Sequence, residues 1–359
     1  MDASTSLRAI DLFSGPGGLT EGLKTAGFEV IGAVEYEPVA AETYAYNHPD
    51  VRLFPLSILD LEPRSVRQEL GLQRGELDLL AGCPPCQGFS SLRTRNGSAA
   101  ANDSRNDLVL QMAIWAKEFL PRAILMENVP ALAQDSRMLK LIDELEKLGY
   151  PAKSAYRILD AQEYGVPQRR RRLVMMVARG GHIEPKRQVF QPRTVRDAIG
   201  SLPEAGRSGD KLHDLPERRT EKVKGIISRI PPDGGSRSDL GEDQLACHKR
   251  VSGFHDIYGR MAWDKPSPTI TSGCSNPSKG RFLHPVENRA ITLREAALLQ
   301  TFPERYWFSL KRGKEAAALM IGNALPPRFV AAHGETIRHH LLCTSELSPA
   351  SSSTSCENS

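Results

Sequence analysis

Short apolar runs alternate with segments of helical periodicity through the first half of the chain. The runs that predict strands cover residues 8–13, 29–35, 76–82, 123–129 and 171–178. The segments with apolar residues at helical spacing cover residues 19–28, 38–48, 107–120 and 138–150. Strands that alternate with helices in this way predict an α/β fold, with a mostly parallel, doubly wound sheet covered by helices on both faces. Ligands of such sheets bind at the carboxyl ends of the strands.

The pattern becomes irregular between residues 181 and 260. Ten Gly and six Pro interrupt every long period there, and 15 Lys and Arg stand against 12 Asp and Glu, a balance of 15 − 12 = +3. Helical patterns return at 292–302 and 327–341, before a Ser-rich tail. We therefore expect a main domain in two parts, a smaller irregular domain between them, and a disordered tail. These would cover 1–180 and 263–341, 181–262, and 342–359 respectively. A loop-rich insertion with a solvated surface would give the same composition.

Composition narrows the class of protein only slightly. The chain has 359 residues, 40% hydrophobic and 25% charged, which is typical of a globular protein of about two domains. No run approaches the ~20 apolar residues of a membrane helix, and the N-terminus lacks a signal-peptide pattern, so we expect a cytoplasmic protein without a membrane partner. Six irregularly spaced Cys predict reduced thiols. The net charge of +4 permits a polyanionic partner without requiring one.

The first predicted strand ends in the glycine-rich sequence DLFSGPGG (11–18). Glycines between a strand and a helix let a ligand approach the backbone closely, and Glu35, at the end of the next strand, can accept hydrogen bonds from ribose hydroxyls. This arrangement suggests a cofactor that contains a nucleoside. The spacing of Gly15, Gly17 and Gly18 does not match the dinucleotide pattern, and a tight structural turn would need the same glycines.

The sequence GCPPCQGFS (82–90) directly follows a buried strand. A Cys at that position lies where a substrate would bind, and its thiolate is a strong nucleophile. Three other interpretations compete. Cys83 and Cys86 could form a redox pair, although two prolines are a poor start for the helix that such a pair normally opens. They could bind zinc, but no second C-x-x-C supplies the remaining ligands. A buried, inert thiol is the third.

Two further motifs lie at the same predicted sheet edge. ENVP (127–130) ends a strand, so Glu127 could exchange a proton with a heterocyclic nitrogen, while Asn128 could instead cap a helix. Four arginines, 169–172, precede the strand 171–178. Such a run is often a solvated or phosphate-binding face. Strand alternation would turn Arg170 and Arg172 to one side and the other two to the opposite side.

Together these motifs resemble those of one family, the cytosine-specific (carbon-5) DNA methyltransferases. The matching segments, in the order in which the family has them, are DLFSGPGG, VEYEPVA, GCPPCQGFS, NDSRNDL, ENVP, QRRRR, TLREAALLQTFP and IGNALPP. The resemblance covers residues 8–179 and about 264–340, roughly 70% of the chain. It implies a Rossmann-like methyltransferase domain that binds S-adenosylmethionine, interrupted by a target-recognition domain at 181–262.

The resemblance also implies roles for individual residues. Cys86 would be the nucleophile, Glu127 the partner of ring nitrogen 3, and Arg172 the donor to the ring carbonyl, supported by Arg170. The cofactor would lie against Phe13, Gly15, Gly17, Glu35, Tyr36, Ile58, Leu108 and Asn323. With Leu108 and Asn323 in one pocket, the C-terminal helix should pack back beside the first strand. The family usually has Asp-Ile where this chain reads Ser57-Ile58, with Asp60 further on. The resemblance therefore does not assign the contact with the adenine amine to a residue of this chain.

A cytosine inside a stacked duplex cannot be reached, so the enzyme would have to flip the base out. Candidates for contacts to DNA are the arginines of the loop after Cys86 and basic residues of the irregular segment: Arg93, Arg95, Arg218, Arg219, Lys222, Lys224, Lys249 and Arg250. A solvated loop is the alternative for Arg93 and Arg95.

The sequence thus predicts a metal-independent, monomeric enzyme that methylates carbon 5 of cytosine in a specific double-stranded DNA sequence. It would be one half of a bacterial restriction-modification pair, with a cognate endonuclease as its genetic partner, or a solitary relative. Three alternatives stay open: a cytosine methyltransferase of the same fold that acts on transfer RNA, a catalytically silent DNA-binding relative, and a redox or zinc protein built on Cys83 and Cys86.

Overall fold

The computed structural model describes residues 6–85, 104–186, 191–243 and 256–346. Its main body is an eight-stranded sheet of order β3-β2-β1-β4-β5-β7-β6, with β8 paired to β7. The strands are β1 (Leu7–Leu12), β2 (Phe28–Val34), β3 (Arg52–Phe54), β4 (Leu79–Gly82), β5 (Ala123–Asn128), β6 (Tyr156–Asp160), β7 (Arg171–Ala178) and β8 (Gly181–His182). The strands from β3 to β5 pair in parallel, whereas β7 runs antiparallel to β5, β6 and β8. The predicted α/β class with a mostly parallel sheet is confirmed.

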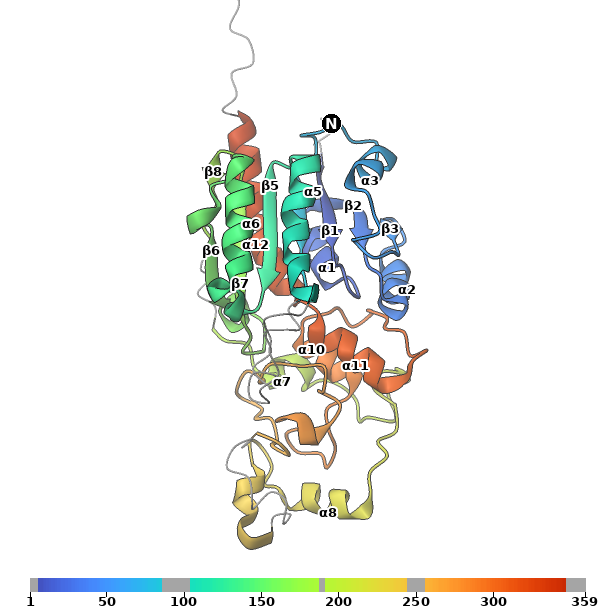
Figure 1. The fold of residues 1–359 in the computed structure, drawn as a ribbon. Coiled ribbons are helices and arrows are strands. Elements are labelled where there is room, and N and C mark those ends of the chain that lie inside the picture. Colours follow the sequence, from blue (N-terminus) through green and yellow to red (C-terminus); the bar gives the residue numbers. More distant parts are fainter. Residues whose placement is uncertain (1–5, 86–103, 187–190, 244–255, 347–359) are drawn as a thin grey trace, which may run out of the picture.

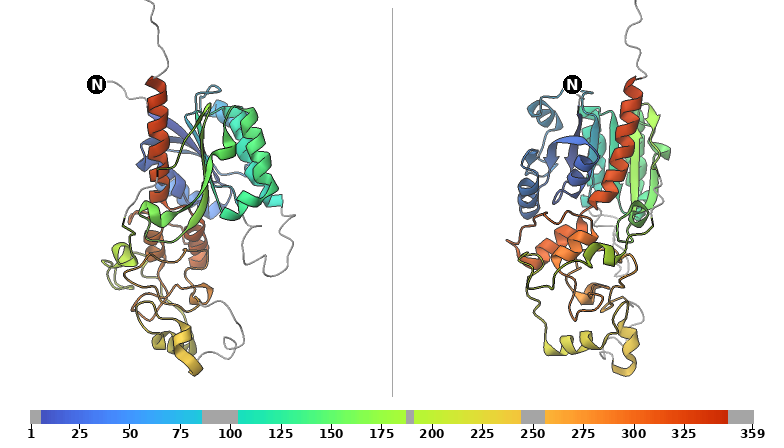
Figure 2. Two further views of the ribbon diagram at one scale, coloured as in Figure 1. Left: turned by 90° about the vertical axis from the view of Figure 1, so that its left-hand side faces the viewer. Right: turned by 180° about the vertical axis from the view of Figure 1, so that it is seen from behind.

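Helices cover both faces of this sheet (Figures 1 and 2). One face carries α3 (Pro63–Glu69), α5 (Gln111–Phe119) and α6 (Ser136–Lys147), and the other carries α1 (Gly18–Thr25), α2 (Pro38–Asn47) and α12 (Pro327–Glu346). Successive residues of a strand point to opposite faces, so Ile10 and Leu12 of β1 join one hydrophobic cluster while Ala9 joins the other. Burial on both faces explains why the strands read as continuous apolar runs.

The C-terminal helix α12 returns to the sheet and packs against α1, as the resemblance implied. A side chain at Gly22 of α1 would come within 2.4 Å of Val330 Cβ, so the two helices meet at nearly backbone distance. Helix α12 continues to Glu346, so residues 342–346, expected in the tail, are helical.

A second body lies below the carboxyl edge of the sheet in Figure 1. It contains α7 (Val195–Ile199), α8 (Glu221–Arg229), α10 (Leu293–Leu299) and α11 (Gly313–Asn323). Across both bodies, the described residues form the short 3₁₀ segments η3 (Ser104–Leu110), η4 (Pro130–Gln134), η5 (Ala152–Ser154), η6 (Ala161–Tyr164), η7 (Arg237–Asp243) and η8 (Pro277–Lys279). One hydrophobic cluster joins α7 to α10 and α11, and reaches the main body at Val39 and Ala40 of α2.

This packing divides the chain differently from the expected boundary at residue 263. Residues 291–324 share their buried core with α7 at 195–199, so the return to the main sheet comes only with the segment that leads into α12. The amphipathic pattern at 292–302 signals a helix but carries no information on which body buries it. Within the described ranges, no helix is both long and apolar enough to cross a membrane.

Candidate active site

The loop between β1 and α1 has an unusual backbone. Phe13 has φ 59°, Gly15 φ 55° and Gly17 φ 98°, all in the left-handed region that favours glycine. A Cβ at Gly17 would lie 2.6 Å from both His48 Nε2 and Tyr306 Oη, so only glycine fits there, whereas a Cβ at Gly15 would meet no atom within 4 Å. The loop therefore packs tightly on its Gly17 side and leaves open space at Gly15.

Glu35 ties this loop to the end of the neighbouring strand β2. Its carboxylate accepts hydrogen bonds from the backbone N–H groups of Gly15, at 2.8 Å, and Glu37, at 2.7 Å. Burial raises the pKa of the Glu35 carboxyl above its usual value, while those two N–H groups act in the opposite direction. Tyr36, the next residue, is 67% exposed. An acceptor and an exposed aromatic ring thus stand together beside the glycine loop.

The other residues expected at the cofactor come from four separate segments. Ile58 is buried, and Phe13 and Leu108 are partly buried against the same hydrophobic cluster. Asn323 is exposed at the last position of α11. Ser57 and Asp60 close one turn after β3, in which Asp60 N–H donates to the Ser57 carbonyl at 2.9 Å. Phe13, Ile58 and Leu108 therefore lie on the same face of the sheet, and the Ser57 hydroxyl accepts a hydrogen bond from the Leu59 N–H at 3.3 Å.

Glu127 and Arg172 form an ion pair at the edge of the sheet, with Nε 2.7 Å from Oε1. Glu127 lies near the end of β5 and Arg172 near the beginning of β7. Because these strands are antiparallel, with Asn128 opposite Leu173, the end of one lies beside the start of the other. Both side chains are largely buried, 16% exposed for Arg172 and 11% for Glu127. A carboxylate and a guanidinium are thus fixed side by side at the edge where ligands bind.

Cys83 and Pro84 connect the next strand to this pair. Cys83 follows β4, and its backbone N–H donates to the Leu12 carbonyl at 3.2 Å. Burial, followed by the nearby charge of Glu127, raises the pKa of the Cys83 thiol well above its usual value. Asn128 Nδ2 donates to the Pro84 carbonyl at 3.1 Å, which links ENVP to the loop that continues to Cys86. Cys86 itself lies outside the described residues.

These contacts bear on two of the alternatives drawn from the sequence. A redox pair needs Cys83 as a thiolate, and burial next to a carboxylate favours the neutral thiol by raising its pKa. No group of three His, Cys, Asp or Glu that could hold a metal occurs among the residues with described positions. The N-cap residue of η4, which begins at Pro130, is Val129 rather than Asn128, so the capping role considered for Asn128 is wrong.

The four arginines alternate as strand geometry predicts. Arg169 and Arg171 are exposed, Arg170 is buried and Arg172 is partly buried. The two inward arginines nevertheless have different surroundings. Arg170 donates from Nη1 to the Ile270 carbonyl at 3.0 Å and from Nη2 to the Ala324 carbonyl at 3.1 Å, and both nitrogens contact the Gly322 carbonyl at 3.2 Å. Arg170 therefore holds IGNALPP against the start of β7 in this structure, while Arg172 faces Glu127.

A buried polar group that the sequence analysis did not single out lies behind the glycine loop. Asp11 Oδ2 accepts a hydrogen bond from Thr20 Oγ1 at 2.7 Å, and Thr20 Oγ1 is 2.8 Å from Tyr44 Oη. Burial raises the pKa of Asp11 to about 7. The signal was available in part, since Asp11 stands among apolar residues in a strand that is buried on both faces.

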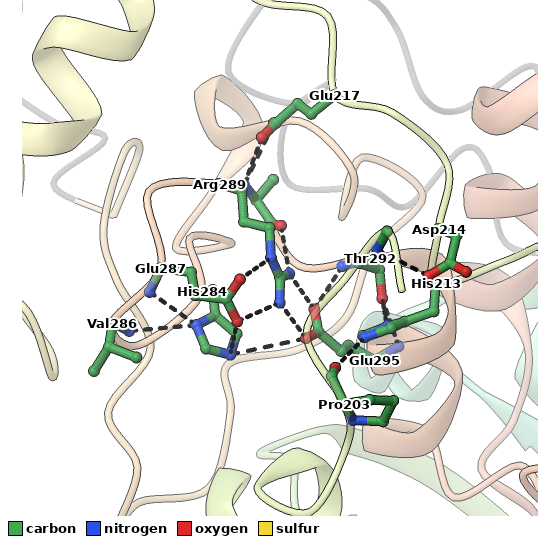
Figure 3. Close-up of polar contacts among 12 residues, drawn as sticks. Pro203, His213, Asp214, Glu217, His284, Val286, Glu287, Arg289, Thr292 and Glu295 are labelled. Atoms are coloured by element: carbon green, nitrogen blue, oxygen red, sulfur yellow. Dashed lines mark hydrogen bonds and ion pairs between the residues drawn. The ribbon is translucent and has the colours of Figure 1, made fainter. Parts of the chain in front are cut away.

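A second polar network, also missed, lies in the second body (Figure 3). Arg289 donates from Nη1 and Nη2 to the two oxygens of Glu295, at 2.7 and 2.8 Å, and from Nε to Glu287 at 2.9 Å. Glu295 also accepts from the Thr292 N–H at 2.7 Å, while the Thr292 hydroxyl lies 2.8 Å from His213 Nδ1. This network fixes the start of α10 to the irregular segment around His213.

The candidate DNA-binding residues are only partly described. Arg218 is exposed, whereas Arg219 pairs with Glu217 at 2.7 Å and donates to the Ser275 carbonyl at 2.9 Å. Lys222 is exposed and Lys224 pairs with Glu221 at 2.9 Å. Arg93, Arg95, Lys249 and Arg250 lie outside the described residues.

A basic hollow of about 350 Å³ lies where β7 begins and the second body meets it. Its lining includes Arg169, Lys265 and Arg281. Arg281 is held by Asp256 at 3.1 Å, but Arg169 and Lys265 are exposed, and neither side chain has an ion-pair partner in the part of the chain that the structure describes. The hollow therefore presents uncompensated positive charge at the junction of the two bodies.

The sheet order, the glycine loop after β1 and the acidic residue after β2 define an α/β enzyme of the Rossmann-like class with a nucleoside-type cofactor site. The family model of C-5 cytosine-specific DNA methylases matches residues 7–339. The chain belongs to this family, as the motifs indicated, and is a DNA (cytosine-5) methyltransferase.

Individual relatives agree with this assignment. The chain is 35% identical to the Type II methylase M.HgiDII of Herpetosiphon aurantiacus, over 92% of this chain and 95% of the relative. It is 30% identical to the Type II methyltransferase M.AgeI of Thalassovita gelatinovora, over 92% and 99%. Among solved structures, a putative DNA modification methyltransferase encoded within a prophage of E. coli superposes with a TM-score of 0.69 at 26% identity, over 94% of this chain and 100% of that one.

Proposed function

We propose that this enzyme transfers a methyl group from S-adenosylmethionine to carbon 5 of a flipped-out cytosine in a specific double-stranded DNA sequence, with Cys86 as the nucleophile. The observation that carries the proposal is the Glu127–Arg172 pair at the edge where β4 leads toward Cys86. A carboxyl group and a guanidinium side by side match the ring nitrogen 3 and the carbonyl oxygen of cytosine in hydrogen-bonding character.

The glycine loop fits S-adenosylmethionine. The open space at Gly15 lets a ligand approach the backbone, Glu35 offers acceptor oxygens to ribose hydroxyls, and the exposed Tyr36 ring offers a stacking surface. Phe13, Gly17, Ile58, Leu108 and Asn323 would complete the site. When bound, the cofactor supplies an electrophilic methyl group on sulfur.

The residues of the chain would make carbon 5 nucleophilic. The Cys86 thiolate adds to carbon 6, which breaks the aromaticity of the ring, and Glu127 holds a proton at nitrogen 3 as negative charge develops there. Arg172 donates to the ring carbonyl and keeps the Glu127 carboxyl in place. After methylation, a base removes the proton from carbon 5, and elimination of the Cys86 thiolate from carbon 6 restores the aromatic ring.

DNA would lie between the sheet and the second body. Flipping the base costs roughly a few kcal/mol, which contacts to the phosphates have to offset. The unpaired cations of the basic hollow, Arg169 and Lys265, support such contacts at this junction. Reading of the sequence falls to the irregular segment 181–262, where Arg218 and Lys222 are exposed. Arg93 and Arg95 would contact phosphates from the loop after Cys86, and Lys249 and Arg250 from the irregular segment.

The resemblance to Type II methyltransferases supports the proposal of a partner endonuclease encoded nearby. We further propose that the enzyme acts as a monomer on DNA in the bacterial cytoplasm. An assay with labelled S-adenosylmethionine tests the proposal. Label should enter double-stranded DNA and not transfer RNA, and Cys86→Ser should abolish incorporation while cofactor binding survives. Label in transfer RNA alone would contradict it.

A further inference from the structure

The buried hydroxyl of Tyr306 supports the glycine loop from behind. Tyr306 Oη donates a hydrogen bond to the Pro16 carbonyl at 2.6 Å and lies 2.9 Å from His48 Nε2. Both residues are 1% exposed, and burial lowers the pKa of His48 to about 4, so its ring is neutral near pH 7. A hydroxyl has one proton, which goes to Pro16. His48 Nε2 therefore carries the imidazole proton and donates to Tyr306.

The turn rests directly on this pair. The atoms that a Cβ at Gly17 would meet first, at 2.6 Å, are His48 Nε2 and Tyr306 Oη. Gly17 also has φ 98°, so backbone conformation and close contact both require glycine here. The position of the Pro16–Gly17 turn is thus set by the two side chains behind it.

Tyr306 belongs to the segment that follows α10, far from the loop in sequence. Its ring is held independently of the hydroxyl, against Phe302 and Phe308 at centroid distances of 4.7 and 5.3 Å. Arg294 Nη1 donates to the Tyr306 carbonyl at 2.9 Å, which fixes the backbone. The next residue, Trp307, exchanges two hydrogen bonds with Asn47 at the end of α2, of 2.8 and 3.0 Å. Removing the hydroxyl alone should therefore leave the local packing in place.

We propose that Tyr306, oriented by His48, is a positioning residue for the cofactor: its hydroxyl holds the Pro16–Gly17 turn in the shape that accepts S-adenosylmethionine. This role rests on the proposed function of the loop. Tyr306 is buried and touches the turn at Pro16 and Gly17, whereas the open space is at Gly15, so it acts through the backbone and not by contact with the ligand.

The test compares two tyrosines that make the same kind of bond. Tyr150 is also buried and donates to a proline carbonyl, that of Pro121 at 2.5 Å, in the region that follows α6. The dissociation constant of S-adenosylmethionine is measured by calorimetry for the full chain, Tyr306→Phe and Tyr150→Phe, together with the unfolding temperature of each. We expect Tyr306→Phe to weaken binding roughly fivefold or more, as one lost hydrogen bond permits, and Tyr150→Phe to change it less than about twofold. Equal dissociation constants for the two variants would overturn the proposal.

His48 gives a second route that leaves Tyr306 intact, should Tyr306→Phe fail to fold. His48→Asn, which is too short to reach the hydroxyl, should weaken cofactor binding, and His48→Gln, whose amide nitrogen can reach it, should restore much of the affinity. The positioning role would be contradicted if His48→Asn bound the cofactor as tightly as the unaltered protein. It would also be contradicted if both His48→Asn and His48→Gln bound it equally weakly. If the unaltered protein does not bind S-adenosylmethionine, the proposed function is wrong. If it binds the cofactor and the variants bind it with the same dissociation constant, the proposed function stands and only the role of Tyr306 is wrong.

Discussion

Arg172 and Glu127 face each other across two antiparallel strands, with Nε 2.7 Å from Oε1, at the edge of the sheet where β4 leads to the expected nucleophile. The antiparallel direction of β7 is what makes this contact. Had β7 run parallel to β5, the start of the strand that carries Arg172 would lie at the opposite edge, a strand length away.

The carboxyl of Glu127 should be essential for the chemical step. Glu127→Gln cannot hold a transferable proton at nitrogen 3, so we expect the rate of methyl transfer to fall about 100-fold or more, with an unchanged dissociation constant for S-adenosylmethionine. Glu118→Gln, which removes a partner of Arg67 far from the site, is the matched control. Single-turnover rates with labelled cofactor measure the effect. A Glu127→Gln rate within about twofold of the unaltered enzyme would exclude this role.

Substitution of Arg170 should mainly reduce stability, and substitution of Arg172 should mainly reduce methyl transfer. Arg170→Met removes the hydrogen bonds from Arg170 to the carbonyls of Ile270, Gly322 and Ala324, of which Ala324 keeps a second side-chain donor, Gln300, so we expect the free energy of unfolding to fall by roughly 3 kcal/mol. Arg172→Met should lose methyl transfer with a smaller loss of stability. Urea denaturation and the methylation assay, applied to both variants, give the comparison. The opposite order of stability losses would show that Arg172 is the structural residue of the two.

The sequence predicted the sheet well where its strands are buried on both faces. Continuous apolar runs identify β1, β2, β4, β5 and β7 because both faces of these strands pack against helices. The runs carry no information on direction, so the antiparallel course of β7 could not be predicted from them. Strand β3, with three residues at the sheet edge, and β6, with exposed residues such as Ile158, lack the pattern altogether.

The site was predictable in its parts but not in its connections. Motif order singled out Glu127, Arg170 and Arg172, yet the alternation that turns both arginines inward cannot tell which one meets Glu127 and which one binds backbone carbonyls. The contact of Tyr306 with Pro16 joins residues 290 positions apart. Such contacts depend on how the second body docks, and local patterns do not encode that.

The unpaired cations of the basic hollow should contribute to DNA binding through counterion release. Each phosphate contact that is lost should reduce the slope of log affinity against log salt concentration by about 0.9, so Arg169→Ala with Lys265→Ala should reduce it by up to about 1.8. The matched control removes two exposed arginines that already pair with acids, Arg196 with Asp264 and Arg207 with Glu204. Fluorescence anisotropy with duplex DNA at several salt concentrations gives the slopes. An equal slope for both double variants would remove the hollow from the DNA interface.

Buried histidines should make stability depend on pH. Burial lowers the pKa of His333 to about 3, while an unfolded histidine titrates near 6.5. Below about pH 6.5 the unfolded chain therefore binds a proton that the folded chain does not, and stability falls as pH decreases, by up to about 1.4 kcal/mol per pH unit for each such group. His48 and His284, with pKa values lowered to about 4 by burial, act in the same direction. Asp11, with its pKa raised to about 7, acts in the opposite direction between about pH 3.8 and 7.

Substituting one of these groups measures its contribution to the pH dependence of stability. His333→Leu keeps an apolar side chain between Tyr164 and Phe329 and takes away the titrating ring. As the pH decreases from 6.5 to 5, the free energy of unfolding of His333→Leu should fall less steeply than that of the unaltered protein. The difference in slope should correspond to about one proton fewer taken up on unfolding. Urea denaturation at several pH values measures both slopes. Identical slopes would mean that the His333 ring is protonated in the folded state.

The most direct test of the central claim is bisulfite sequencing of DNA from a host that expresses the full chain, compared with a host that expresses Cys86→Ser. Carbon-5 methylation with Cys86 as the nucleophile predicts protected cytosines at one position of one recurring sequence in the first host and none in the second. Protected cytosines in the Cys86→Ser host at the level of the first, or none in either host although the protein is expressed and folded, would contradict it.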